Sequence, residues 1–145
     1  MKLTDLAILD WVLINNTPHK IQAIDSIDAE ILADDELYYV GEDRCHSEDK
    51  IEGIQLIPEI LEKNGFYDSY TKRYYKRFYS NGCFDIAISL VYREIEVSKV
   101  CSAGTDCEEE EYGSAIAFGN DICVHTLQHT LRLCGLNELA DNFKI

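Results

Sequence analysis

The sequence lacks any apolar run close to the ~20 residues that a helix needs to cross a bilayer. Its beginning, Met1 to Leu6, has no long apolar segment followed by a small-residue cleavage site. We therefore expect a soluble, cytoplasmic protein that makes no membrane contact. The length of 145 residues is close to the commonest domain size, so we expect a single domain over residues 1–145.

Motifs of common enzymes are also missing. The chain has no phosphate-binding glycine pattern, no nucleophile elbow and no C-x-x-C pair. Cys45 and His46 would serve as nucleophile and base only if the fold brought a separate orienting group to them. We expect no enzyme activity, no catalytic residue and no cofactor.

Six cysteines are present, an even number that is also compatible with disulfide bonds. Because no secretion signal is recognised, we expect reduced thiols, several of them buried as small apolar side chains. They are Cys45, Cys83, Cys101, Cys107, Cys123 and Cys134.

Basic residues are scarce, 13 against 27 acidic ones, which gives a formal net charge of −14. Residues 25–62 contain thirteen acidic and two basic residues, whereas residues 63–100 contain four acidic and seven basic ones. Binding to duplex nucleic acid needs a broad basic surface, so we expect none. A small anion in a local basic pocket is compatible with this charge pattern.

Residues 67–79 combine aromatic and cationic side chains, five of the nine tyrosines and four of the Lys/Arg residues. Aromatic rings stack on bases, and cations hold phosphates, although an ordinary half-exposed strand has the same composition. The candidate ligand-binding residues are Lys72, Arg73, Tyr74, Tyr75, Lys76, Arg77 and Tyr79.

Asn81-Gly82 precedes an alternating run, Phe84 to Tyr92, and so predicts a β-hairpin. A two-residue loop places on the apolar face Tyr79, Arg77, Tyr75 and Arg73. A three-residue loop ending at Gly82 in the left-handed conformation places there Phe78, Lys76, Tyr74 and Lys72. We favour the second register, because it sets Arg77 opposite Asp85 and Phe78 opposite Phe84. A helical alternative has a stripe of Tyr67, Tyr70, Tyr74 and Phe78.

The pattern over the whole chain predicts an α+β fold with an antiparallel sheet or a partly open small barrel. A helix is expected at about 58–64, with Pro58 in its first turn and Gly65 after its end. A second is expected at about 122–134, capped by Asn120 or Asp121. Expected strands lie around residues 11–14, 20–24, 27–32, 37–40, 67–79, 84–92, 94–100 and 115–118, with surface loops at 41–50 and 101–113, and one more short helical turn after 136.

His125 and His129 are four residues apart, so on a helix they share a face, as two metal ligands would. The zinc-protease pattern requires Glu directly after the first His, and here that residue is Thr126. We therefore expect no metal, and keep the two histidines as secondary candidates on a polar helix face.

Three segments resemble a recurrent family of small proteins, mostly uncharacterised, that gut bacterial genomes, their phages and mobile elements carry. The segments are 2–12, 54–66 and 124–135. The family usually has Gly-Asn where this chain has Leu9-Asp10, and a His and a Gln recur in its closing helix. The resemblance implies no known activity, but a phage or mobile-element origin suggests an accessory protein that blocks host defences.

We therefore expect a non-catalytic binding protein that sequesters a small anionic ligand such as a nucleotide signal. Two alternatives stay open. One is an inhibitor whose acidic surface, residues 25–62 and Glu108 to Glu111, binds a basic host protein. The other is a structural homo-oligomer that assembles through an exposed strand or helix.

Overall fold

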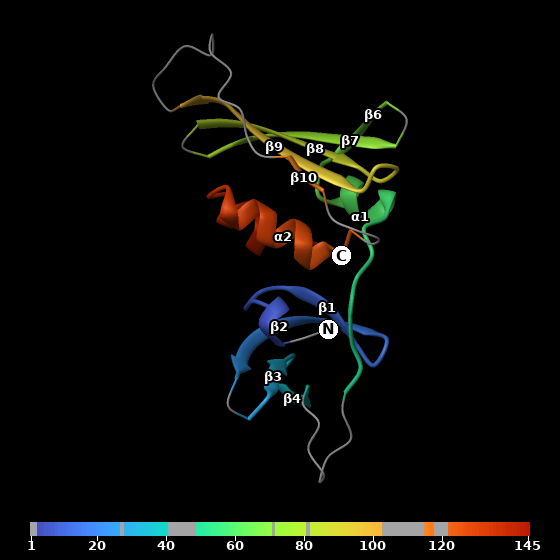
Figure 1. The fold of residues 1–145 in the computed structure, drawn as a ribbon, viewed down its shortest axis with the longest axis vertical. Helices are drawn as coiled ribbons and strands as arrows, with labels where there is room; N and C mark the ends of the chain where they lie inside the picture. The colour runs from blue at the N-terminus through green and yellow to red at the C-terminus, as the bar shows by residue number, and fades with distance from the viewer. Residues whose placement is uncertain are drawn as a thin grey trace. The chain divides into compact units, whose positions relative to one another are not determined.

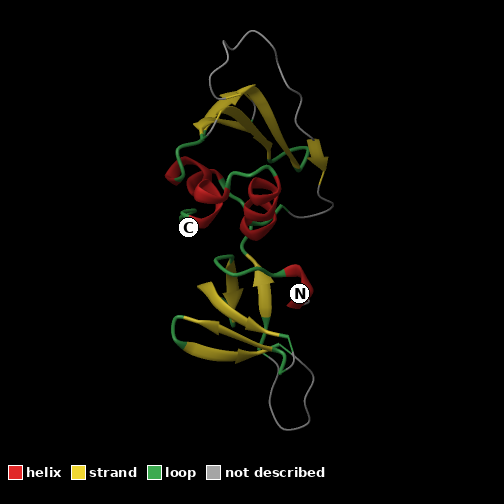
Figure 2. Cartoon of the chain, turned by 90° about the vertical axis from the view of Figure 1, so that its left-hand side faces the viewer, coloured by secondary structure: helices red, strands yellow, loops and turns green. Residues whose placement is uncertain are grey.

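The computed structural model describes residues 3–26, 28–40, 49–70, 72–80, 82–102, 115–117 and 122–145. The chain divides into two compact units, residues 1–55 with 123–129 and residues 56–122 with 130–145. Both units hold an antiparallel sheet (Figures 1 and 2). Of the three α-helices that the described residues form, one lies between the two sheets in sequence and two follow the second sheet. The predicted α+β class is confirmed, with two open sheets instead of one. The expectation of a single domain stays a prediction.

The first sheet has the strand order β4-β3-β2-β1-β5. Its strands are β1 (Trp11–Ile14), β2 (Thr17–Asp25), β3 (Glu30–Ala33), β4 (Glu36–Tyr39) and β5 (Ile51–Gly53). The residues that join β1 to β2, Asn15 and Asn16, both have positive φ, as do Asp34 and Asp35 between β3 and β4. Tight hairpin turns need positive φ at both central residues, which Asn and Asp tolerate. The strands expected around residues 11–14, 20–24, 27–32 and 37–40 correspond to β1 to β4, whereas β5 was not predicted.

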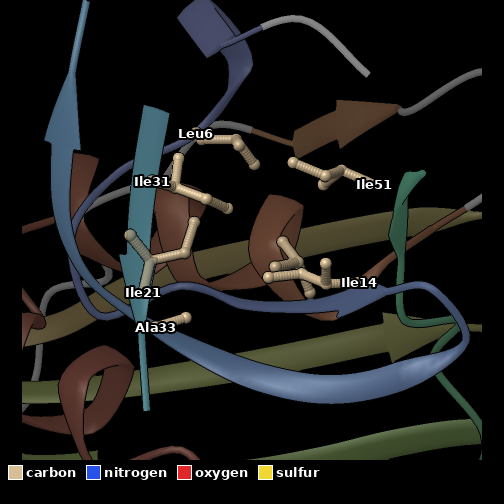
Figure 3. Packing of buried hydrophobic residues seen from close by; sticks show 7 residues of the cluster. Leu6, Ile14, Ile21, Ile31, Ala33 and Ile51 are labelled. Atoms are coloured by element: carbon tan, nitrogen blue, oxygen red, sulfur yellow. The ribbon is translucent and has the colours of Figure 1, made fainter. Parts of the chain in front are cut away.

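The core of the first unit lies between these strands (Figure 3). Its side chains are almost fully buried, 8 % exposed or less: Leu6, Val12, Ile14, Ile21, Ile31, Ala33 and Ile51. They come from alternate positions of their strands, because successive side chains of a strand point to opposite faces. The N-terminal 3-10 turn, Leu3–Asp5, leads into Leu6 and so closes one side of this cluster.

The second sheet has the strand order β10-β9-β8-β7-β6. Its strands are β6 (Tyr67–Tyr70), β7 (Arg73–Tyr79), β8 (Gly82–Ser89), β9 (Glu94–Ser102) and β10 (Ala115–Ala117). Phe78 pairs with Phe84 and Arg77 pairs with Asp85, so the favoured three-residue register is confirmed. Gly82 has φ +144°, outside the left-handed helical conformation expected for it.

The stretch 67–79 forms two antiparallel strands, β6 and β7. This corrects the expectation of one continuous strand over 67–79, and also its helical alternative. Lys72 is exposed in the turn between them with φ +59°, and so does not extend the core face of β7. Strand β8 ends at Ser89, earlier than expected. Tyr92, expected at the end of the alternating run of this strand, instead lies in the following turn and is 76 % exposed.

Three helices follow the predicted pattern closely. They are α1 (Pro58–Lys63), α2 (Val124–Leu133) and α3 (Asn137–Asp141). Both Gly65 and Gly135 have φ +79°, the left-handed conformation that ends a helix. Helix α2 contributes residues 124–129 to the first unit and residues 130–133 to the second. No helix of the described residues is both long and apolar enough to span a membrane.

Some expectations concern residues outside the described ranges. These are Asn81, the loop residues 41–48, most of the loop 101–113 with its acidic run, and the caps Asn120 and Asp121. Among the cysteines, Cys83, Cys123 and Cys134 carry free thiols.

Candidate functional site

The second unit contains a pocket of about 330 Å³. The end of α1, strand β7, helix α3 and the segment after α3 supply its lining. The lining residues are Lys63, Asn64, Gly65, Lys76, Phe78, Glu138, Leu139, Asn142 and Lys144. Three cations therefore face one carboxylate around this pocket, in a protein whose formal net charge is −14.

Lys76 reaches the pocket from the core face of the second sheet. It pairs with Ile86, which in turn pairs with Val97, and both of these side chains are buried. Directly paired residues of an antiparallel sheet share a face, so Lys76 continues a row of core residues. Its ammonium donates a hydrogen bond to the Asn64 carbonyl and lies 5.7 Å from the centre of the Phe66 ring. Burial lowers the pKa of Lys76, because desolvation disfavours the charged amine.

Gly65 makes room for this ammonium. A Cβ on Gly65 would lie 2.9 Å from Lys76 Nζ, and the φ of +79° is unfavourable for other residues. The same glycine that ends α1 therefore also keeps space for the lysine.

Asn64 fixes the backbone beside the pocket. Its side-chain amide donates to the carbonyl of Lys144 and accepts from the amide of Lys144, at 2.6 and 2.8 Å. Lys63 Nζ donates to the carbonyl of Ile145. These contacts hold the last residues of the described chain against the end of α1, and so bring Lys144 to the pocket.

Two of the three pocket lysines contact main-chain oxygens, Lys63 that of Ile145 and Lys76 that of Asn64. Within the described ranges, no Asp or Glu side chain forms an ion pair with Lys63, Lys76 or Lys144. Other basic residues of the same unit do have such partners, as Arg132 shows with Asp141 at 3.0 Å. The pocket thus keeps its positive charge available for an anion.

The outer face of β7 is different, because its arginines are occupied by neighbouring acids. Arg73 pairs with Glu96 at 2.8 Å, and Arg77 binds both carboxylate oxygens of Asp85 at 2.7 and 2.9 Å. Partial burial and the Asp85 carboxylate raise the pKa of Tyr75 to about 12. Since Arg77 is bound to Asp85, the pKa of that carboxyl is lowered.

The candidate residues of 67–79 therefore lie in different environments and do not form one site. Only Lys76 lines the pocket. Tyr74 is buried at 4 % exposure, which raises the pKa of its phenol, and Tyr79 is 72 % exposed. The other pocket residues were not predicted from the sequence. Asn64-Gly65 at a helix end was visible as a cap, but its contact with residues 80 positions away carries no sequence signal.

The two histidines of α2 belong to the first unit, and His129 contacts Asp10 just before β1. His129 Nε2 is 2.7 Å from Asp10 Oδ2, and the Asp10 carboxylate, fully buried, also accepts from the amide of Ala7. Gln128, fully buried, donates to the carbonyl of Leu9 and accepts from the amide of Trp11. These side chains tie α2 to the start of the first sheet.

His125 corrects the expectation of a polar helix face, because it is 7 % exposed. Its Nδ1 is buried without a hydrogen-bond partner in the structure as described. Desolvation lowers the pKa of His125, opposed by the Asp10 charge and assisted by His129. Gly53 faces this ring closely: a Cβ there would lie 2.8 Å from His125 Cε1 and 2.5 Å from Cys123 Sγ.

No metal centre emerges from this arrangement. Among the residues that can be described, no three His, Cys, Asp or Glu side chains are grouped as metal ligands. A comparison with known proteins found no matching family model, no similar curated protein and no similar solved structure.

Proposed function

We propose that the protein is a non-catalytic binding protein that holds a small phosphorylated anion in the pocket of its second unit. The observation that carries the proposal is the set of three lysines around one pocket, none of which forms an ion pair with a described Asp or Glu side chain: Lys63, Lys76 and Lys144. Unpaired cations on a concave surface attract anions. In a chain with 13 basic and 27 acidic residues, acidic side chains would be the simplest partners for these lysines, yet the acid that lines the pocket, Glu138, forms no ion pair with them.

The size of the pocket fits a small ligand. A volume of about 330 Å³ lies at the low end of the range for ligand sites, roughly 300 to 1,000 Å³. Phe78 and Leu139 add apolar contact area beside the cations. A nucleotide signal with one sugar and one base is compatible with this volume, and sequestration of such a ligand agrees with the accessory role that we expect.

The experiment is calorimetric titration of inorganic phosphate, pyrophosphate and nucleoside monophosphates into the wild-type protein and into Lys76→Met. Methionine keeps the length and apolar stem of the lysine. Lys50→Met is the matched control, because Lys50 lies on the surface of the first unit and pairs with Glu52. We expect binding of at least one phosphorylated anion by wild type and Lys50→Met, and a clear loss in Lys76→Met. No heat with any of these anions would contradict the proposal.

A further inference from the structure

Glu138 is the feature of the pocket that simple anion binding does not explain. Its carboxylate is exposed, lines the pocket with the three lysines, and forms no ion pair within 4.0 Å with any side chain that the structure describes. The negative charges of a carboxylate and a phosphate repel each other, so Glu138 disfavours the binding of inorganic phosphate in this pocket. The same carboxylate is an acceptor for hydroxyl groups.

The lining thus offers three kinds of contact. Lysine ammonium groups can bind phosphate oxygens, Glu138 can accept from two hydroxyls, and the apolar side chains Phe78 and Leu139 can cover a ring. A carboxylate that accepts hydrogen bonds from sugar hydroxyls is a recurrent means of recognising ribose. The small volume has room for one sugar and one phosphate group, with or without a base.

We infer that the pocket binds a phosphate monoester that carries a vicinal diol, with the phosphate on the lysines and the diol on Glu138. This inference rests on the proposed function and makes it specific. A ribonucleoside monophosphate and a sugar phosphate share the required chemistry. They differ only in whether a base is present.

The test compares five probes by calorimetry: AMP, 2′-deoxy-AMP, ribose 5-phosphate, adenosine and inorganic phosphate. The variant is Glu138→Gln, which removes the charge and keeps the shape. Glu94→Gln is the control, because Glu94 is an exposed residue of the same unit outside the pocket lining. All titrations use the full chain at one ionic strength.

For the wild type and the control we expect AMP to bind about tenfold or more tightly than 2′-deoxy-AMP, because the deoxy compound loses a charge-assisted hydrogen bond. In Glu138→Gln this ratio falls toward one, while inorganic phosphate binds more tightly. If Glu138 had only a structural role, Glu138→Gln would weaken the binding of AMP and of 2′-deoxy-AMP by the same factor. Ribose 5-phosphate equal to AMP supports a sugar phosphate, and tighter binding of AMP supports a nucleotide.

Different results would contradict the diol inference and the proposed function. Equal affinity for AMP, 2′-deoxy-AMP and inorganic phosphate, unchanged in Glu138→Gln, overturns the diol inference and leaves the proposed function standing. Absence of binding for every phosphorylated probe overturns both.

Discussion

The ammonium of Lys76 donates a hydrogen bond to the main-chain carbonyl of Asn64, with 2.5 Å between nitrogen and oxygen. The lysine belongs to β7 and the asparagine to the end of α1, so the contact joins the sheet to the helix. It holds the cation in the pocket with its charge unmatched by any carboxylate of the described residues.

Lys76→Met should weaken binding of a phosphorylated ligand about 10-fold to 100-fold, because one charge-assisted hydrogen bond contributes roughly 1.5 to 3 kcal/mol. The fold should survive, because burial already disfavours the charged form of this lysine. Thermal unfolding checks the fold and calorimetry checks affinity. Unchanged affinity in a folded variant would remove Lys76 from the site.

Gly65→Ala should lower both stability and affinity. The backbone strain at φ +79° costs about 1 to 2 kcal/mol for a residue with a Cβ, and the new Cβ would displace Lys76 Nζ. Gly135→Ala is the matched control, because Gly135 has the same φ and no atom within 4 Å of a Cβ. Denaturant unfolding should show a loss in both variants, whereas affinity should fall only in Gly65→Ala. Equal affinities would separate Gly65 from the ligand site.

Arg77→Met and Arg73→Met should leave ligand affinity within about twofold of wild type, because both guanidinium groups are bound to acids on the outer face and exposed charges are screened by salt. Titration of the same anions at physiological ionic strength checks this expectation. A tenfold loss in either variant would move the site to the outer face of β7.

His125 should make the protein less stable in acid. Its pKa in the folded protein is lowered, so the unfolded chain binds the proton first as the pH falls. The stability that the neutral ring provides is complete above the unfolded pKa of about 6.5 and is lost as the pH falls below that value. Free energies of unfolding at pH 7.5, 6 and 5 should decline more steeply for the wild type than for His125→Gln. Parallel declines would show that another group causes the acid sensitivity.

Gly53→Ala should destabilise the first unit by about 1 to 3 kcal/mol, the usual cost of overpacking, since a Cβ would lie 2.5 Å from Cys123 Sγ. Chemical unfolding checks this value. Cys123→Ala in the same chain should recover part of the loss, because it removes the nearest clashing atom. No recovery would point to the His125 ring as the dominant clash.

The features that depend on neighbouring residues in the sequence were predicted correctly. The pairing of Arg77 with Asp85, the helix begun by Pro58 and the helix ends at Gly65 and Gly135 all follow from turn, capping and alternation rules. The separation of 67–79 into two strands was missed, because aromatic residues recur on both sides of the turn that contains Lys72 and the stretch has no Gly or Pro to mark a turn.

The site was only partly predictable. Lys76 was one of four cations of residues 67–79 among the candidates, and Arg73 and Arg77 looked equally suitable until their acidic partners were located. Lys144 and Glu138 carry no local signal of their own. They reach the pocket through tertiary contacts, above all the hydrogen bonds of Asn64 with Lys144.

The most direct test of the pocket is a titration of the ¹⁵N-labelled protein with AMP, followed by amide chemical shifts. We expect the largest changes at Gly65, Lys76 and Lys144, and we expect them to disappear in the triple variant Lys63→Met, Lys76→Met, Lys144→Met. Changes centred on Arg73 and Arg77 of the outer face, or the absence of changes at millimolar AMP, would contradict this expectation.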